Sequence, residues 1–233
     1  MFRFRTLPLL SAISLTGAVA LAQQTPVPAT TATPPTPAAS PTVARRPLSP
    51  AGTAATQVGG KWAKVEGSDE PRYTEGKWIE VTYSRPIKRG RQDLFGKGAE
   101  YGKKVTGEDA PLWRLGANQT TRLKTEVPLE IGGKRLAPGE YSLFADLKEG
   151  GWTLVISNQE YQQKYDANNK AATWGAYAYD SKFDVVRVPM KMMKPAVSVD
   201  QFTIGFADMT DSGGKLAMAW DREGAMVEFK VVP

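Results

Sequence analysis

Hydrophobic and polar residues alternate along much of the chain after residue 57, in short runs separated by turn-forming residues. In KLAMAWD, residues 215–221, the side chains of Leu216, Met218 and Trp220 fall on one face of an extended strand. Because side chains of a strand point alternately to its two faces, such a segment can bury one face against a partner sheet. The same alternation occurs in four other segments: WIEVTYSRP (78–86), WTLVIS (152–157), FTIGFAD (202–208) and MVEFKVV (226–232).

Glycine, proline and aspartate mark the turns between these segments. DREG, residues 221–224, is expected to connect two strands as a hairpin, and Pro86 ends another strand because it has no amide donor. Residues 158–172 are the one segment for which a helix is plausible, and no strand–helix–strand alternation occurs. The pattern therefore predicts an all-β fold, an antiparallel sandwich or barrel of about eight to ten strands.

The first 22 residues have a different character. Arg3 and Arg5 precede an apolar run, residues 6–22, that ends with small residues at Ala20 and Ala22. These three parts together are typical of a secretory signal peptide. We therefore expect export to the periplasm or the extracellular space, cleavage after Ala22, and no transmembrane segment in the mature protein. The alternative is an uncleaved anchor, since the apolar run lies at the lower limit of what spans a bilayer.

Residues 23–57 are rich in proline, alanine and threonine and contain no aromatic side chain. Such a segment buries too little apolar surface to offset the entropy lost on folding, so we predict a disordered, extended linker. It either holds the domain away from an envelope surface or has no task of its own. The remaining 176 residues, 58–233, have the size of one domain with its own core.

Charge and composition exclude several classes of function. Of the 30 Lys and Arg residues, four arginines lie within residues 1–57, which leaves 26 basic against 24 acidic side chains in the domain. This near balance argues against nucleic-acid binding, which needs a basic surface. Cysteine and histidine are absent, so disulfides, the usual zinc sites and Ser-His or Cys-His nucleophiles are excluded. We expect no cofactor and no metal site.

Seven short motifs follow one another between residues 72 and 231. They are VTYSRPIKRGR, LFGKGAEYGK, LWRLGAN, LAPGEYSLF, WTLVIS, TWGAYAYD and DVVRV. Together they resemble the uncharacterised bacterial family catalogued as domain of unknown function 2911. The resemblance covers nearly the whole domain and implies a predominantly β, usually exported protein. It implies no activity, because none is established for that family.

Arginines, aromatic residues and one asparagine gather in the motifs YSRP, KRGR, WRLGAN and WGAYAYD. A guanidinium group suits a carboxylate or phosphate, an aromatic ring offers a stacking wall, and an amide both donates and accepts hydrogen bonds. If the fold brings these residues together, they form a pocket for an anion or a sugar. The candidate ligand-binding residues are Arg85, Arg91, Trp113, Arg114, Asn118, Trp174 and Tyr177.

The competing interpretation treats the same residues as scaffold, and we favour it for Arg114. On this interpretation Arg114 is buried against a carboxylate, Trp113 is partly buried in the core, and Asn118 bonds backbone groups in a turn. Removing Arg114 would then strand a buried charge. The loop DMTDSGG, residues 208–214, is expected to be a hairpin turn and not a calcium site, because it lacks the terminal glutamate and regular spacing of such loops.

Three functions remain open, and no catalytic residue is assigned. The leading hypothesis is a non-catalytic exported module that binds a small anionic ligand, a carbohydrate or an envelope protein. The second is a structural or protein-interaction domain without a pocket. The third is a hydrolase that uses paired carboxylates, for which the candidates are Glu140, Asp180, Asp184 and Glu223.

Overall fold

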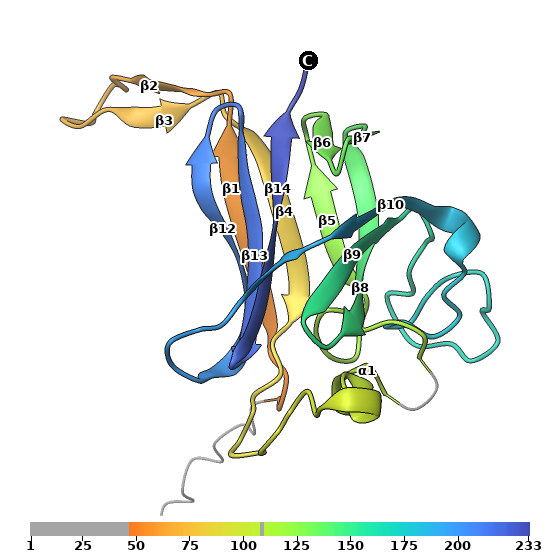
Figure 1. The fold of residues 1–233 in the computed structure, drawn as a ribbon. Helices are drawn as coiled ribbons and strands as arrows, with labels where there is room; N and C mark the ends of the chain where they lie inside the picture. The colour runs from red at the N-terminus through yellow and green to blue at the C-terminus, as the bar shows by residue number, and fades with distance from the viewer. Residues whose placement is uncertain (1–46, 108–109) are drawn as a thin grey trace, which may run out of the picture. The chain divides into compact units, whose positions relative to one another are not determined.

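The computed structural model describes residues 47–107 and 110–233, and strands dominate it (Figure 1). The strands of five residues or more are β1 (Ala51–Val58), β4 (Lys77–Ser84), β5 (Thr121–Thr125), β8 (Gly139–Lys148), β9 (Gly151–Ser157), β10 (Asp184–Pro189), β12 (Val199–Thr210), β13 (Gly213–Asp221) and β14 (Glu223–Val231). The three-residue strands are β2 (Lys61–Ala63), β3 (Arg72–Thr74), β6 (Leu129–Ile131), β7 (Lys134–Leu136) and β11 (Lys191–Met193). The helices are short: α1 (Lys103–Thr106) and the 3-10 turns η1 (Gly98–Glu100) and η2 (Ser181–Phe183).

The longer strands form two antiparallel sheets packed face to face, which confirms the predicted all-β antiparallel fold. One sheet has the order β1-β4-β5-β8-β9-β10, and the other has the order β12-β13-β14-β6-β7, with β11 also paired to β14. The sheets approach each other at both edges, where β1 contacts β12 and β10 contacts β7. Among the described residues, no helix has the length and apolar character needed to cross a membrane.

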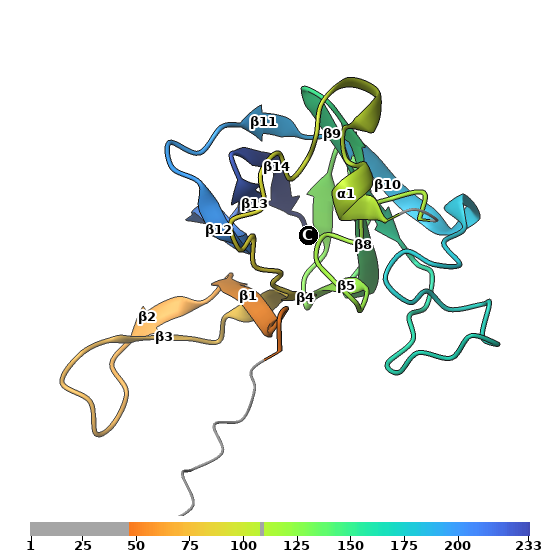
Figure 2. The same cartoon turned by 90° about the horizontal axis from the view of Figure 1, so that it is seen from below.

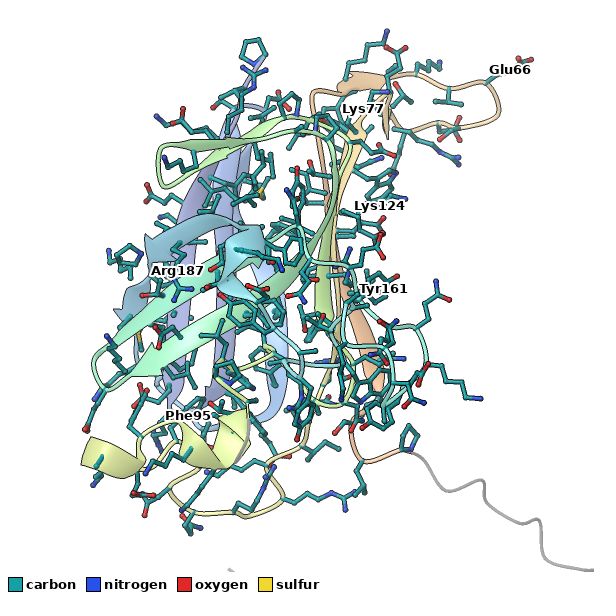
Figure 3. All side chains as sticks on the ribbon, turned by 90° about the vertical axis from the view of Figure 1, so that its right-hand side faces the viewer. Glu66, Lys77, Phe95, Lys124, Tyr161 and Arg187 are labelled. Carbon is teal, nitrogen blue, oxygen red and sulfur yellow. The ribbon has the colours of Figure 1, made fainter. Side chains whose placement is uncertain are left out.

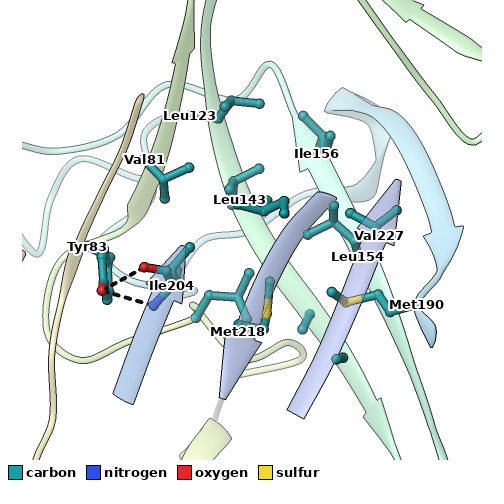
Figure 4. Packing of buried hydrophobic residues seen from close by; sticks show 14 of the residues in the cluster. Val81, Tyr83, Leu123, Leu143, Leu154, Ile156, Met190, Ile204, Met218 and Val227 are labelled. Atoms are coloured by element: carbon teal, nitrogen blue, oxygen red, sulfur yellow. Dashed lines mark hydrogen bonds between the residues drawn. The ribbon is translucent and has the colours of Figure 1, made fainter. Parts of the chain in front are cut away.

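The core lies between the sheets and is built from the alternating positions found in the sequence. Leu216 and Met218 of β13 are buried, as are Leu154 and Ile156 of β9. The hydroxyl of Tyr83 reaches across from β4 to β12, where it accepts a hydrogen bond from the amide of Ile204 and donates one to its carbonyl (Figure 4). The alternation therefore predicted correctly which face of these strands meets the core, but the opposite face of β9 is buried as well, where Val155 packs with Phe144 of β8 in a second apolar cluster.

The predicted boundary of the linker at residue 57 is wrong. Residues 51–58 form β1, an edge strand that pairs with β4 along its whole length, from Ala51 opposite Ser84 to Val58 opposite Lys77. The composition of residues 51–58 does not indicate a strand, because they include few large apolar side chains. Of these residues, Val58 alone is fully buried. The edge of β4 provides the backbone hydrogen-bond partners of β1, and the local sequence does not reveal this pairing. The predicted signal peptide and residues 23–46 of the predicted linker lie outside the described residues.

The predicted helix at 158–172 is also absent, and this segment is a loop. The side chains of two buried glutamines replace the backbone hydrogen bonds that a helix would have made. Gln159 donates to the carbonyls of Ala171 and Ala178, and Gln162 donates to the carbonyl of Ala172. Because these glutamines satisfy carbonyls far along the chain, the loop closes on itself. It is held to the sheet where Ser142 of β8 donates to the carbonyl of Gln159 and the guanidinium of Arg122 in β5 lies over the ring of Tyr161.

Candidate functional site

The loop that follows β4 crosses one end of the sandwich, the end onto which Figure 2 looks. Two backbone hydrogen bonds hold this loop against β12: the amide of Lys88 donates to Asp200, and the amide of Phe202 donates to Pro86. The ammonium group of Lys88 also forms an ion pair with Asp221 at 2.5 Å, and both side chains are largely buried. The loop is therefore fixed in place by β12 and by the turn between β13 and β14.

A cavity of about 370 Å³ opens between this loop, α1 and the loop that precedes β5. Apolar walls come from Ile87, Val105 and Trp220, and further residues of its lining precede β1. We call this cavity the basic pocket, because four cationic side chains line it: Arg89, Arg91, Lys104 and Arg114.

No described aspartate or glutamate lines the basic pocket, and its four cations form no ion pair with any carboxylate in the described ranges. Arg91 donates instead to the backbone carbonyls of Ile87 and Lys88, and Lys104 donates to the carbonyl of Asp93. Like charges that line one cavity repel one another unless an anion lies between them. The pocket is therefore a region of positive potential.

Arg114 is half-buried, and its Nε atom is buried without a hydrogen-bond partner in the structure. Burial lowers the pKa of the Arg114 guanidinium, an effect that the neighbouring Tyr177 opposes. The expected carboxylate partner is not found among the described residues, so that part of the scaffold interpretation is wrong for them. A desolvated guanidinium without a partner is costly, and a bound anion would offset that cost.

Two glycines allow the motif WRLGAN to pack closely: Gly175 lets it pack against WGAYAYD, and Gly116 lets it pack against the end of β4. A Cβ atom on Gly175, where φ is +62°, would lie 2.7 Å from Cδ of Arg114 and 2.8 Å from the carbonyl oxygen of Asn118. A Cβ atom on Gly116 would lie 2.8 Å from the carbonyl oxygen of Ser84. Both positions therefore need glycine, and Gly175 helps to set the position of the Arg114 side chain.

Aromatic rings form the floor of the basic pocket. The guanidinium of Arg91 lies over the ring of Trp220, 5.4 Å from its centroid, within the range of a cation–π interaction. Behind Trp220, the ring of Trp113 stacks at 6.3 Å with an interplanar angle of 12°. Trp113 is fully buried, so its candidacy as a ligand contact is corrected: it supports the floor from within the core.

None of the other four candidates is among the described residues that line this pocket. Arg85 lies outside it, at the seam between β1 and β12, where it donates to the carbonyl of Phe202. Asn118 is exposed with φ of +60°, and its side chain makes no hydrogen bond within the described chain. Trp174 is half-buried with its ring 5.9 Å from that of Tyr165. Tyr177 is 45% exposed, and its amide donates a hydrogen bond to the carbonyl of Trp174.

One protein-family model matches most of this chain. The model of the family described as "Protein of unknown function (DUF2911)" matches residues 68–230. The chain belongs to this family. In this DUF2911 protein, the four cations of the basic pocket and Trp220 all lie within the matched residues. No curated protein and no solved structure matches the chain.

Three of the four carboxylates that would serve a hydrolase are paired with cations in this DUF2911 domain, and the first of them, Glu140, pairs with Arg122. Asp180 pairs with Lys182, and Asp184 accepts a hydrogen bond from Tyr179 and pairs with Arg187.

The residues of the basic pocket that the sequence analysis did not select as ligand-binding candidates are Arg89, Lys104 and Trp220, which come from three separate segments. Within residues 47–107 and 110–233, no three potential metal-ligating side chains gather in one place.

Proposed function

We propose that this DUF2911 protein is an exported, non-catalytic module that binds a small organic anion in the basic pocket. One observation carries the proposal: four cationic side chains converge on a cavity whose described lining has no carboxylate, and one of them, Arg114, has a buried and unpartnered Nε atom. The ligand class is a compound with a phosphate, sulfate or carboxylate group.

The walls of the pocket indicate what the rest of such a ligand is like. A guanidinium group binds an oxyanion through parallel N–H donors, and Arg114 is the most desolvated donor of the set. Ile87, Val105 and Trp220 offer apolar surface beside these donors. An anion attached to an apolar or aromatic body would therefore bury more surface than inorganic phosphate and bind more tightly.

Export is the second part of the proposal, and it rests on the basic, apolar and small-residue parts of residues 1–22. We expect the mature protein, recovered from outside the cytoplasm, to begin at Gln23 when its N-terminus is sequenced. A mature chain that retains Met1 would contradict cleavage.

Titration calorimetry with phenyl phosphate, inorganic phosphate and uncharged phenol tests the binding site. We expect phenyl phosphate to bind best, phenol not to bind, and Arg114→Met to weaken phenyl phosphate binding by about tenfold or more. The affinity should fall as salt is added, because the attraction is electrostatic. The free energy of unfolding should change by less than about 1 kcal/mol, because no described ion pair is lost.

The matched control is Arg72→Met, which removes an exposed arginine of β3 outside the pocket. It should leave binding unchanged. If Arg114→Met binds phenyl phosphate as well as the unaltered protein does, the proposed site is wrong. If Arg114→Met instead unfolds the protein, Arg114 has a structural partner, and Arg91→Met then decides whether the pocket binds anions.

A further inference from the structure

The opposite end of the sandwich carries a small projecting hairpin. It consists of β2, β3 and the residues 64–71 that connect them, and we call it the finger (Figures 1 and 2). The finger continues the β1–β4 pair beyond the sheet. It therefore lies far along the strands from the basic pocket, next to the turn between β12 and β13.

One tyrosine braces the finger against the sandwich. The hydroxyl of Tyr73 accepts a hydrogen bond from the amide of Gly60 at 2.8 Å and donates one to the carboxylate of Asp211 at 3.2 Å. Its ring fills the space beside two glycines: a Cβ atom would lie 2.6 Å from the ring at Gly60 and 2.7 Å at Gly76. The finger is therefore attached through specific contacts.

This braced hairpin presents a tryptophan to solvent. Trp62 is 73% exposed, and its ring lies edge-on to Tyr73 with centroids 5.7 Å apart. Its indole N–H makes no hydrogen bond to any described residue. Tryptophan has a large apolar surface that proteins normally bury, so an exposed tryptophan on a braced support is a feature of interaction sites.

Trp62 forms one wall of a hollow of about 500 Å³ between the finger and the β12–β13 turn. Polar groups stand on the other side: the amide of Gln57, the hydroxyl of Thr210 and the carboxylate of Asp211. Tyr73 donates a hydrogen bond to one carboxylate oxygen of Asp211. The side-chain amide of Gln57 has no hydrogen-bond partner among the described residues. The hollow thus combines an aromatic wall with groups able to donate and accept hydrogen bonds.

We infer that the hollow at the finger binds an uncharged carbohydrate chain. The flat apolar face of a sugar ring fits against the exposed indole of Trp62, and its hydroxyl groups meet Gln57 and Asp211. No lysine or arginine lines the hollow and Asp211 repels anions, so an anionic ligand is disfavoured.

A membrane surface is disfavoured by charge as well. The finger carries three acidic side chains, Glu66 at its projecting end (Figure 3), Asp69 and Glu70, against three basic ones, Lys61, Lys64 and Arg72. Without a net positive charge it gains no electrostatic attraction to anionic lipid headgroups. The inference does not depend on the proposed function, because the two sites share no lining residue.

Titration of the whole domain with cellohexaose and with the hexamer of N-acetylglucosamine tests the inference. We expect at least one to bind and to shift the tryptophan fluorescence, and Trp62→Ala to weaken that binding about tenfold or more. Trp62→Phe should retain part of the affinity. The control is Trp78→Ala, because Trp78 is 43% exposed on the adjoining β4 but does not line the hollow.

Two results would contradict the inference. If neither oligosaccharide binds at millimolar concentration, or if Trp62→Ala and Trp78→Ala weaken binding equally, the hollow is not a carbohydrate site, and a protein contact becomes the better explanation of Trp62. Arg114→Met should leave oligosaccharide binding unchanged, and Trp62→Ala should leave phenyl phosphate binding unchanged. This cross-test separates a failure at one site from a failure at the other.

Discussion

The two ends of the sandwich present functional side chains in opposite ways. At the end with the basic pocket, the side chains have a fixed support: Arg91 is exposed but lies over the buried Trp220, Arg114 is half-buried, and the pair Lys88–Asp221 holds the supporting loop in place. At the finger end, Trp62 extends from a three-residue strand and is mostly exposed. The four cations of the basic pocket lie within the family match, whereas Trp62 precedes its first matched residue.

This difference indicates where a substitution should change both stability and ligand binding, and where it should change binding alone. The cations of the basic pocket depend on a rigid support that keeps them in place, so changes to that support, at Trp113 or Lys88, should alter both folding and binding. An aromatic side chain on a projecting hairpin has few neighbours to lose, so changes there should alter binding alone. The following four predictions test that contrast, from the largest effect to the smallest.

Removal of β1 should affect both ends, because this strand runs from the edge of the basic pocket to the base of the finger. A chain that starts at Gly59 should be less stable than one that starts at Pro47 by about 5 kcal/mol or more. It loses an eight-residue ladder and the burial of Val58 and Ala54. Urea unfolding of the two chains measures the difference, and equal midpoints would mean that β1 is not part of the fold.

Two tryptophans compare the ends directly. Trp113→Ala removes a fully buried ring of the aromatic floor and should lower the free energy of unfolding by about 3–5 kcal/mol. Trp62→Ala removes an exposed ring and should change it by less than about 0.5 kcal/mol. Denaturant titration of both variants is the measurement. Comparable losses would show that the finger belongs to the core and that the contrast is wrong.

Two ion pairs, one at each end, allow a comparison in which smaller changes in stability are expected. Lys88→Met should cost about 2–3 kcal/mol, because it leaves the largely buried Asp221 with the hydroxyl of Ser198 as a partner. The control is Lys215→Met at the finger end, where the partner Asp208 is mostly exposed and the pair should be worth less than about 1 kcal/mol. Thermal unfolding at neutral pH should rank the two variants in this order.

The same pair predicts a dependence on pH. Burial acts to raise the pKa of Asp221, but hydrogen bonds from Lys88 and Ser198 and the charge of Lys88 outweigh it and hold the pKa below its ordinary value. The resulting stability is present above the unfolded pKa of about 3.9 and is lost as the pH falls through the lower folded value. Below about pH 4, the thermal midpoint of Asp221→Asn should therefore fall less steeply than that of the unaltered protein.

The sequence alone determined the properties that depend on local pattern. Alternation assigned Leu216, Met218 and Trp220 to one buried face, and the structure confirms it because a strand directs every second side chain to the same side. The absence of histidine and cysteine excluded whole classes of chemistry before any contact was known. The seven ordered motifs identified the family, and the family match confirms it.

Only the tertiary structure decided what depends on neighbours distant in the chain. It placed Arg91 and Arg114 in one pocket and Arg85 outside it, although all three had looked equivalent. Backbone pairing with β4 made residues 51–58 a strand despite their linker-like composition. Burial, charge pairing and edge pairing all arise between segments that meet only after folding, so no local pattern could reveal them.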